Sequence, residues 1–151
     1  MIKGLYEAHL PVSNLLVSID FYKSLGLEVA FQNETLVFFG IEKGRSWVGL
    51  WETEKVETPY HPSLRHVAFQ VDSEEMNKVK AWLEAKGIII RTAFGFPPEH
   101  QPLVLPNFPH AHAAIYFHDP DGNSLELITP LKIDFEERFE MMSLKEWNSK
   151  N

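Results

Sequence analysis

The sequence contains no cysteine. This absence excludes a disulfide framework, a zinc–thiolate site, an iron–sulfur cluster and a cysteine nucleophile. It does not by itself fix the compartment, although a small protein without disulfides is more typical of the cytoplasm than of an oxidising space.

Long hydrophobic runs are also missing. No stretch approaches the ~20 consecutive apolar residues that a membrane-spanning helix needs. The N-terminal segment reaches Glu7 before the apolar core of a signal peptide could form. We therefore expect a cytoplasmic protein that does not insert into a membrane.

Positive charge is scarce, with 14 Lys and Arg against 21 Asp and Glu and a net charge of −7. This balance opposes attraction to nucleic-acid phosphates and to anionic membranes, so neither is expected as a partner. The 151 residues, of which 44% are hydrophobic, are typical of one ordinary globular domain or of two small units.

Two parts of the chain repeat one pattern of strands and helices. A helix capped by Ser13 or Asn14 is expected from Leu15 to a stop at Gly26. Another, capped by Ser73, is expected from Glu74 to a stop at Gly87. The expected strands are 5–12, 27–31, 36–41 and 47–51 in the first part, and 65–71, 88–91, 112–117 and 124–128 in the second. The order β-α-β-β-β occurs twice, which predicts an α+β fold of two modules forming a curved mixed sheet around a shared cleft.

The modules are separated and followed by segments of different composition. Residues 4–52 form module one, the polar stretch 53–62 a linker and residues 63–129 module two, so that the domain spans 1–131. Residues 93–111 hold five of the ten prolines and have no counterpart in module one, which favours a functional loop or a lid. Residues 132–151 are expected to form a helical tail.

Aligning the two modules with each other gives four equivalent positions, three of which carry side chains that can bind a metal. Glu7 falls opposite His66, and Gly49 falls opposite Glu126. If the modules pair about a pseudo-twofold axis, these positions converge in one cleft. One imidazole and two carboxylates suit a divalent ion such as Mn²⁺, Fe²⁺, Ni²⁺, Zn²⁺ or Mg²⁺.

Three segments in order resemble the vicinal oxygen chelate superfamily, which includes glyoxalase I, fosfomycin-modifying thiol transferases, extradiol dioxygenases and bleomycin-resistance proteins. They are Leu10-Pro11-Val12-Ser13-Asn14-Leu15 with Ser18–Tyr22, Arg65–Asp72, and Tyr116-Phe117-His118-Asp119-Pro120-Asp121-Gly122-Asn123-Ser124-Leu125-Glu126-Leu127. The resemblance covers residues 4–129. It implies a glyoxalase-like fold, and it implies that residue 7, residue 49, residue 66 and residue 126 are the metal positions.

The implied metal site has three ligands, Glu7, His66 and Glu126, around one divalent ion. Position 7 is usually His or Gln in the family and position 49 often carries Glu in glyoxalases, whereas this chain has Glu and Gly there. His9 lies two residues from Glu7 on the same face. It could replace Glu7 as a ligand, lie next to the ligands without binding the ion, donate a hydrogen bond to the substrate, or only fill the wall of the cleft. As a lone residue, His66 could equally be a hydrogen-bonded structural histidine.

Further residues could form the substrate site. Trp47, Gly49 and Trp51 share one strand face, and the glycine would leave space for a substrate group between two indoles, although an aromatic stripe is more often core. Tyr116 could place a phenol near the metal. His110 and His112 could bind a metal from one strand face, although their position beside Pro109 favours a loop and a strand edge. The other histidines, at 61, 100 and 118, favour surface positions.

Three functions fit this pattern. The first is a metal-dependent enzyme (lyase or isomerase, thiol transferase, or dioxygenase) in which Glu126, Glu7 or His9 moves a proton. The second is a protein of the bleomycin-resistance type that sequesters a small molecule, and the third is a regulatory domain. The resemblance also implies a homodimer, because the family commonly pairs its modules across subunits.

Overall fold

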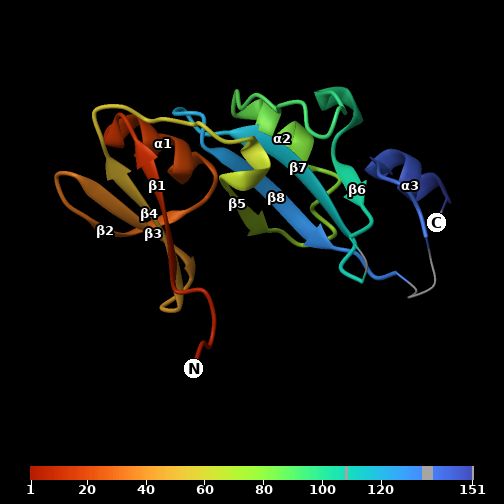
Figure 1. Cartoon of the computed structure of the whole chain (residues 1–151), viewed down its shortest axis with the longest axis horizontal. Helices are drawn as coiled ribbons and strands as arrows, with labels where there is room; N and C mark the ends of the chain where they lie inside the picture. Colours follow the sequence, from red (N-terminus) through yellow and green to blue (C-terminus); the bar gives the residue numbers. More distant parts are fainter. Residues whose placement is uncertain (108, 134–137, 151) are drawn as a thin grey trace. The chain divides into compact units, whose positions relative to one another are not determined.

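The computed structural model describes residues 1–107, 109–133 and 138–150, and these form two compact units (Figure 1). Unit 1 comprises Met1–His61 with Asp119–Asn123, and unit 2 comprises Pro62–His118 with Ser124–Asn151. In the part of the chain that is described, none of the helices has the length and apolar character needed to cross a membrane.

Unit 1 is a four-stranded sheet with one helix. Its elements are β1 (Glu7–Val12), α1 (Leu15–Ser24), β2 (Glu28–Gln32), β3 (Leu36–Glu42) and β4 (Ser46–Glu52). The strand order is β1-β4-β3-β2, with β1 parallel to β4 and the other neighbours antiparallel. The β-α-β-β-β order expected for the first module is confirmed.

Helix α1 covers one face of this sheet. The side chain of Asn14 caps the helix by accepting a hydrogen bond from the backbone N–H of Val17 at 3.0 Å. One side of the helix is apolar and buried, as are alternate residues of the strands. These buried residues are Leu15, Ile19 and Tyr22 of the helix and Val12, Val37, Phe39, Val48 and Leu50 of the strands.

The turn Asp119–Asn123 also belongs to unit 1, far along the chain from the rest. The buried carboxylate of Asp119 accepts hydrogen bonds from the Tyr22 hydroxyl at 3.0 Å and from the Asn123 side chain at 2.8 Å. Asn123 in turn donates to the carbonyl of Pro11 at 2.8 Å, and the hydroxyl of Ser13 donates to Asp121. The turn Asp119–Asn123, which is part of the Tyr116–Leu127 segment noted in the sequence, therefore anchors itself to α1 and to the end of β1.

Unit 2 is a five-stranded sheet with order β5-β8-β7-β6-β9. Its elements are a 3₁₀ turn (Pro62–Leu64), β5 (His66–Gln70), α2 (Val79–Ala85), a second 3₁₀ turn (Pro98–His100), β6 (Leu103–Leu105), β7 (His112–His118), β8 (Ser124–Pro130), β9 (Met142–Ser143) and α3 (Leu144–Lys150). Strand β5 is parallel to β8, and the other neighbours are antiparallel. The α+β, glyoxalase-like fold class is confirmed.

Helix α2 begins later than the sequence pattern predicts, so the expectation of a helix from Glu74 capped by Ser73 was wrong. Residues 73–78 form consecutive turns with hydrogen bonds three residues apart, such as Met76 N–H to the Ser73 carbonyl at 3.3 Å. These turns already bury Met76, which is 1% exposed, before the helix starts at Val79.

The strand expected at 88–91 is not formed, and β6 takes its place in the sheet. Ile90 makes only an isolated bridge to Phe117. The side-chain amide of Gln101 lies between the segment at Arg91 and strand β7. Its Nε2 donates to the Arg91 carbonyl at 2.6 Å, and its Oε1 accepts from the Tyr116 N–H at 3.1 Å. The Gln101 side chain thus replaces the direct hydrogen bond that the Arg91 carbonyl and the Tyr116 N–H would form in a continued strand pair.

The Pro-rich stretch 93–111 is not a lid as a whole. Leu103, Val104 and Leu105 form β6 and are buried, and β6 pairs with both β7 and β9. The tail differs as well: Met142 lies in β9 rather than in a helix, and the helix spans only Leu144–Lys150. Phe135, also expected in that helix, lies outside the described residues.

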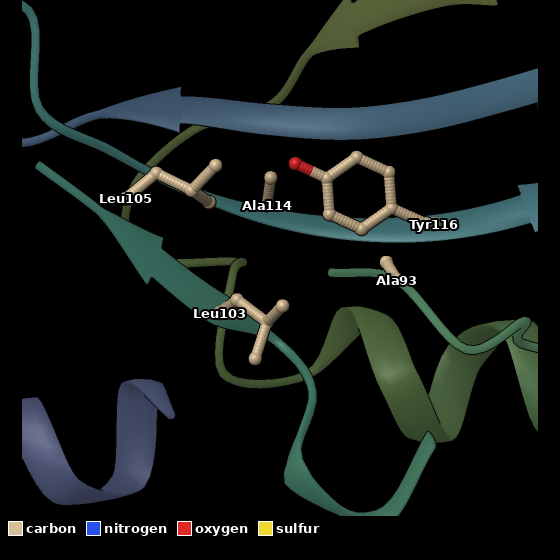
Figure 2. Close-up of a cluster of buried hydrophobic side chains, with 5 residues drawn as sticks. All are labelled: Ala93, Leu103, Leu105, Ala114 and Tyr116. Carbon is tan, nitrogen blue, oxygen red and sulfur yellow. The ribbon is translucent and has the colours of Figure 1, made fainter. Parts of the chain in front are cut away.

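The face of the unit 2 sheet that bears Glu126 and Tyr116 carries a small apolar cluster, shown in Figure 2. Its buried members are Ala93, Leu103, Leu105, Ala114 and Tyr116. The phenol ring of Tyr116 lies beside Ala114 on β7, and Ala93 approaches from the neighbouring loop. The cluster holds Tyr116 in a fixed position next to the polar residues described below.

Candidate metal centre

His66 and Glu126 meet on neighbouring strands of unit 2. Strand β5 pairs with β8 so that Ala68 stands opposite Glu126, and His66 lies two residues earlier on the same face. The Nε2 atom of His66 is 3.4 Å from Oε2 of Glu126. The local register therefore brings together two of the three predicted metal ligands.

The imidazole of His66 is oriented by the turn before its strand. Its Nδ1 atom lies 3.1 Å from the carbonyl oxygen of Ser63. A carbonyl only accepts, so Nδ1 carries a hydrogen and donates it. In the neutral ring Nε2 then keeps a lone pair on the side of Glu126, where a cation could bind, whereas in the protonated ring Nε2 donates to the Glu126 carboxylate. A ring nitrogen fixed in this way is the usual arrangement of a metal-binding histidine.

The carboxylate of Glu126 is buried, with 6% of its side chain exposed. Burial raises its pKa above the ordinary value, while the charges of His66, His112 and Arg91 and a hydrogen bond from Tyr116 act in the opposite direction. A divalent cation bound to this carboxylate would carry two positive charges in direct contact with it and would further stabilise its charged form.

Tyr116 supplies a neutral hydroxyl beside this pair. Its pKa is raised, mainly by burial and then by the charge of Glu126, so the phenol keeps its proton at neutral pH. It hydrogen-bonds to Glu126, and the guanidinium carbon of Arg91 lies 5.1 Å from its ring centroid. Tyr116 can therefore donate a hydrogen bond to Glu126 or to another oxygen near it.

These side chains line a pocket of about 250 Å³ within unit 2. Its polar lining includes His66, Glu126, Tyr116, Arg91 and His112, and its apolar lining includes Phe94. The sequence analysis missed Arg91 and Phe94. The one signal that could have drawn attention to Phe94 is the glycine that follows it, since an X-Gly pair is typical of a tight turn.

In unit 1, Glu7 and His9 form a second pair on β1. Nε2 of His9 lies 3.3 Å from Oε1 of Glu7, and the indole N–H of Trp51 donates to Nδ1 of His9. Because Nδ1 accepts this bond, the neutral ring carries its hydrogen on Nε2 and donates it to Glu7. Both nitrogens of His9 are engaged, while Glu7 keeps 44% of its side chain exposed.

Gly49 does not provide the space for substrate that we expected between Trp47 and Trp51. All three lie on the face of β4 that carries Glu7 and His9 through the parallel β1–β4 register. A Cβ atom on Gly49 would lie 2.8 Å from Nδ1 of His9 and 2.9 Å from Cε1 of Phe38. The volume above Gly49 is occupied by these two rings.

Within residues 1–107, 109–133 and 138–150, no three His, Asp or Glu side chains gather into a group that could hold a metal ion. The structure instead shows two pairs, Glu7 with His9 in unit 1 and His66 with Glu126 in unit 2. The second pair fits a divalent ion on the chemistry of its donors: one imidazole nitrogen with a directed lone pair and one buried carboxylate.

Comparison with known proteins shows a family match over residues 5–127, to the glyoxalase/bleomycin resistance protein/dioxygenase superfamily. The chain belongs to this superfamily. A curated relative, the metallothiol transferase FosB of Staphylococcus epidermidis, is 29% identical over 133 residues, which is 85% of each chain. The FosB protein of Staphylococcus haemolyticus matches to the same extent.

Solved structures of other proteins show the same fold. An integron cassette protein from the mobile metagenome of the Halifax Harbour sewage outfall superposes with a TM-score of 0.67 and 27% identity, covering 85% of this chain and 99% of that one. The fosfomycin resistance protein FosX of Listeria monocytogenes, in a complex with Mn(II) and a sulfate ion, gives a TM-score of 0.62 with 25% identity, covering 84% and 90%.

Proposed function

We propose that this chain is a metal-dependent enzyme that transfers a thiol to a small substrate. The observation that carries the proposal is the His66–Glu126 pair, with its directed Nε2 lone pair and buried carboxylate 3.4 Å apart. The names of the FosB relatives, which describe metallothiol transferases, and the Mn(II) complex of FosX support the proposal. The bound ion would act as a Lewis acid toward neighbouring oxygens of the substrate.

Glu7 is proposed as the third protein ligand, with His9 as the residue that orients it. Both nitrogens of His9 are engaged, by Trp51 and by Glu7, whereas Glu7 keeps an exposed carboxylate. Mixing Glu7→Ala chains with Glu126→Ala chains tests the origin of this ligand. Metal binding regained on mixing means that the ligand comes from a second copy, and no recovery means that it comes from the same chain.

The residues have distinct roles in this proposal. His66 and Glu126 hold the ion, and Glu126 or Glu7 can also accept the proton of the thiol. The neutral hydroxyl of Tyr116 donates to an oxygen of the substrate. If the substrate is an epoxide, the sulfur–carbon bond forms as a ring carbon–oxygen bond breaks, the thiol loses its proton and the released oxygen gains one, so no outside oxidant or reductant is needed.

The test is an addition assay with Mn²⁺-loaded protein, L-cysteine or glutathione as the thiol and fosfomycin as the epoxide, followed by phosphorus NMR. The proposal predicts an adduct whose formation requires the metal and falls at least about 100-fold in Glu126→Ala and His66→Ala. No adduct with either thiol from fully metal-loaded protein would contradict it. A lyase, isomerase or dioxygenase reaction of this chain stays a prediction. Its cytoplasmic location and its choice among divalent metal ions also stay predictions.

Sequestration without chemistry is the alternative, and the same assay separates it, since a binding protein takes up the compound without forming product.

We also propose a homodimer. Unit 1 exposes several large aromatic side chains, among them Phe31 (53% exposed) and Trp51 (45% exposed), and such surfaces are typical of interfaces. Light scattering at micromolar concentration should give twice the mass of the chain, and a single-chain mass would contradict the proposal.

A further inference from the structure

Phe94 occupies a backbone conformation that bulky residues rarely adopt. Its φ angle is +50° and that of Gly95 is +80°. Ala93 and Phe96 on either side exchange both backbone hydrogen bonds, at 3.0 and 2.8 Å, so the four residues form a closed two-residue turn. Turns with two positive φ angles favour Asn followed by Gly, because a larger side chain crowds its own backbone there.

Burial does not explain this strained phenylalanine. Phe94 is 50% exposed, whereas its neighbour Ala93 is buried in the cluster of Figure 2 and Phe96 packs against the same cluster. These two neighbours anchor the turn to the core without help from Phe94. An asparagine at position 94 would suit the turn better and would cost little apolar contact.

The turn directs the ring of Phe94 into the pocket that holds His66 and Glu126. The ring meets that of Tyr116 edge to face, with centroids 5.6 Å apart and planes at 79°. Leu105 and Ile128 add apolar lining to the same pocket. The polar groups proposed to hold the ion are therefore flanked by an aromatic wall made of Phe94 and Tyr116.

We propose that Phe94 is a specificity-determining residue, which makes the site prefer substrates carrying a flat apolar group next to the oxygens that reach the metal. The inference rests on the proposed function, because it assumes an ion at His66 and Glu126. When such a group enters the pocket, it covers the exposed half of the Phe94 ring. The binding free energy of this contact offsets the conformational strain of the turn.

The test compares benzohydroxamate with acetohydroxamate, two chelators with the same pair of oxygens that differ in the ring. Calorimetric titration of the Mn²⁺-loaded protein should show benzohydroxamate binding about tenfold more tightly, the size expected for one aromatic ring packing on another. Phe94→Asn should lose this preference and bind acetohydroxamate and Mn²⁺ as the unaltered chain does. Ile89→Asn, a change at a residue that is 84% exposed and outside the pocket lining, is the control and should keep the preference.

Thermal unfolding of the metal-free protein provides a second arm that needs no metal. Phe94→Asn should unfold at the same or a higher temperature, because it relieves the left-handed strain. A large drop in unfolding temperature would mean that Phe94 is a core residue and would overturn the inference, as would equal binding of the two hydroxamates by metal-loaded protein. Failure of the protein to take up Mn²⁺ would instead overturn the proposed function on which the inference rests.

Discussion

The imidazole of His9 lies directly over Gly49, so that a Cβ atom on Gly49 would come within 2.8 Å of Nδ1 of His9. The glycine leaves room for the ring, whose Nδ1 accepts from Trp51 and whose Nε2 lies 3.3 Å from Glu7. Any side chain at position 49 would move His9. The departure of this chain from the glutamate of glyoxalases thus has a local structural reason.

Gly49→Ala should displace His9 and Phe38 and lower the free energy of unfolding by about 1–3 kcal/mol, the usual cost of overpacking. The indole N–H resonance of Trp51 should also shift, because its acceptor moves. Gly40→Ala on β3 is the matched control, since no atom lies within 4 Å of its added Cβ. An unchanged Trp51 resonance in Gly49→Ala would contradict the contact.

Gln101→Leu should destabilise unit 2, because it removes the amide that joins the Arg91 carbonyl to the Tyr116 N–H. Each backbone group left buried without a partner costs about 1–3 kcal/mol. Urea unfolding measures the loss. Gln70→Leu, at an exposed position of β5, should change the free energy of unfolding by less than about 0.5 kcal/mol. Equal stability of the two variants would exclude the bridging role.

Asp119 should make stability depend on pH in a direction opposite to that of most paired carboxylates. Burial raises its pKa above the ordinary value of 3.8, although hydrogen bonds from Asn123, Tyr22 and Asp121 act against this. The folded state therefore holds the proton to higher pH than the unfolded chain does, and the stability that the proton confers is lost as pH rises through the folded pKa.

The comparison with Asp119→Asn isolates this effect. The free energy of unfolding of the unaltered chain minus that of the variant should fall as pH rises from about 3, by at most about 1.4 kcal/mol per pH unit, and then level off. Urea titrations at a series of pH values measure the difference. A difference that grows with pH would place the folded pKa below the ordinary value instead.

Much of unit 1 could be predicted from the sequence because its signals are local. The side-chain cap of Asn14, the apolar spacing of α1 and the short apolar runs of β3 and β4 each depend on residues that are near one another in the chain. The equivalence of the modules also identified His66 and Glu126 as partners, and the structure places them 3.4 Å apart.

The errors in unit 2 arose where long-range contacts decide the local structure. Strand β6 lies between prolines and could not be recognised from periodicity, since three buried residues give no pattern. The segment near Arg91 has the composition of a strand, yet the side chain of Gln101 takes the place of its partner. Phe94 lines the pocket because it lies in a turn with a positive φ angle, which residue propensities do not predict for phenylalanine.

Glu7 and His9 should differ in their effect on metal affinity. Glu7→Ala removes the proposed ligand and should abolish tight binding, whereas His9→Ala removes only the residue that orients it and should weaken binding about 10- to 100-fold. Calorimetry with Mn²⁺ measures both constants. Glu28→Ala, at an exposed position of β2, is the control and should bind Mn²⁺ normally. A larger loss in His9→Ala than in Glu7→Ala would make His9 the ligand.

The most direct test of the account is the metal content of four proteins purified without chelator and saturated with Mn²⁺: the unaltered chain, His66→Ala, Glu126→Ala and His100→Ala. His100 is exposed and lies outside the pocket lining, so its variant controls for the loss of one imidazole. Elemental analysis should find one ion per chain in the unaltered protein and in His100→Ala, and almost none in the other two. Full metal content in folded His66→Ala or Glu126→Ala would contradict the site.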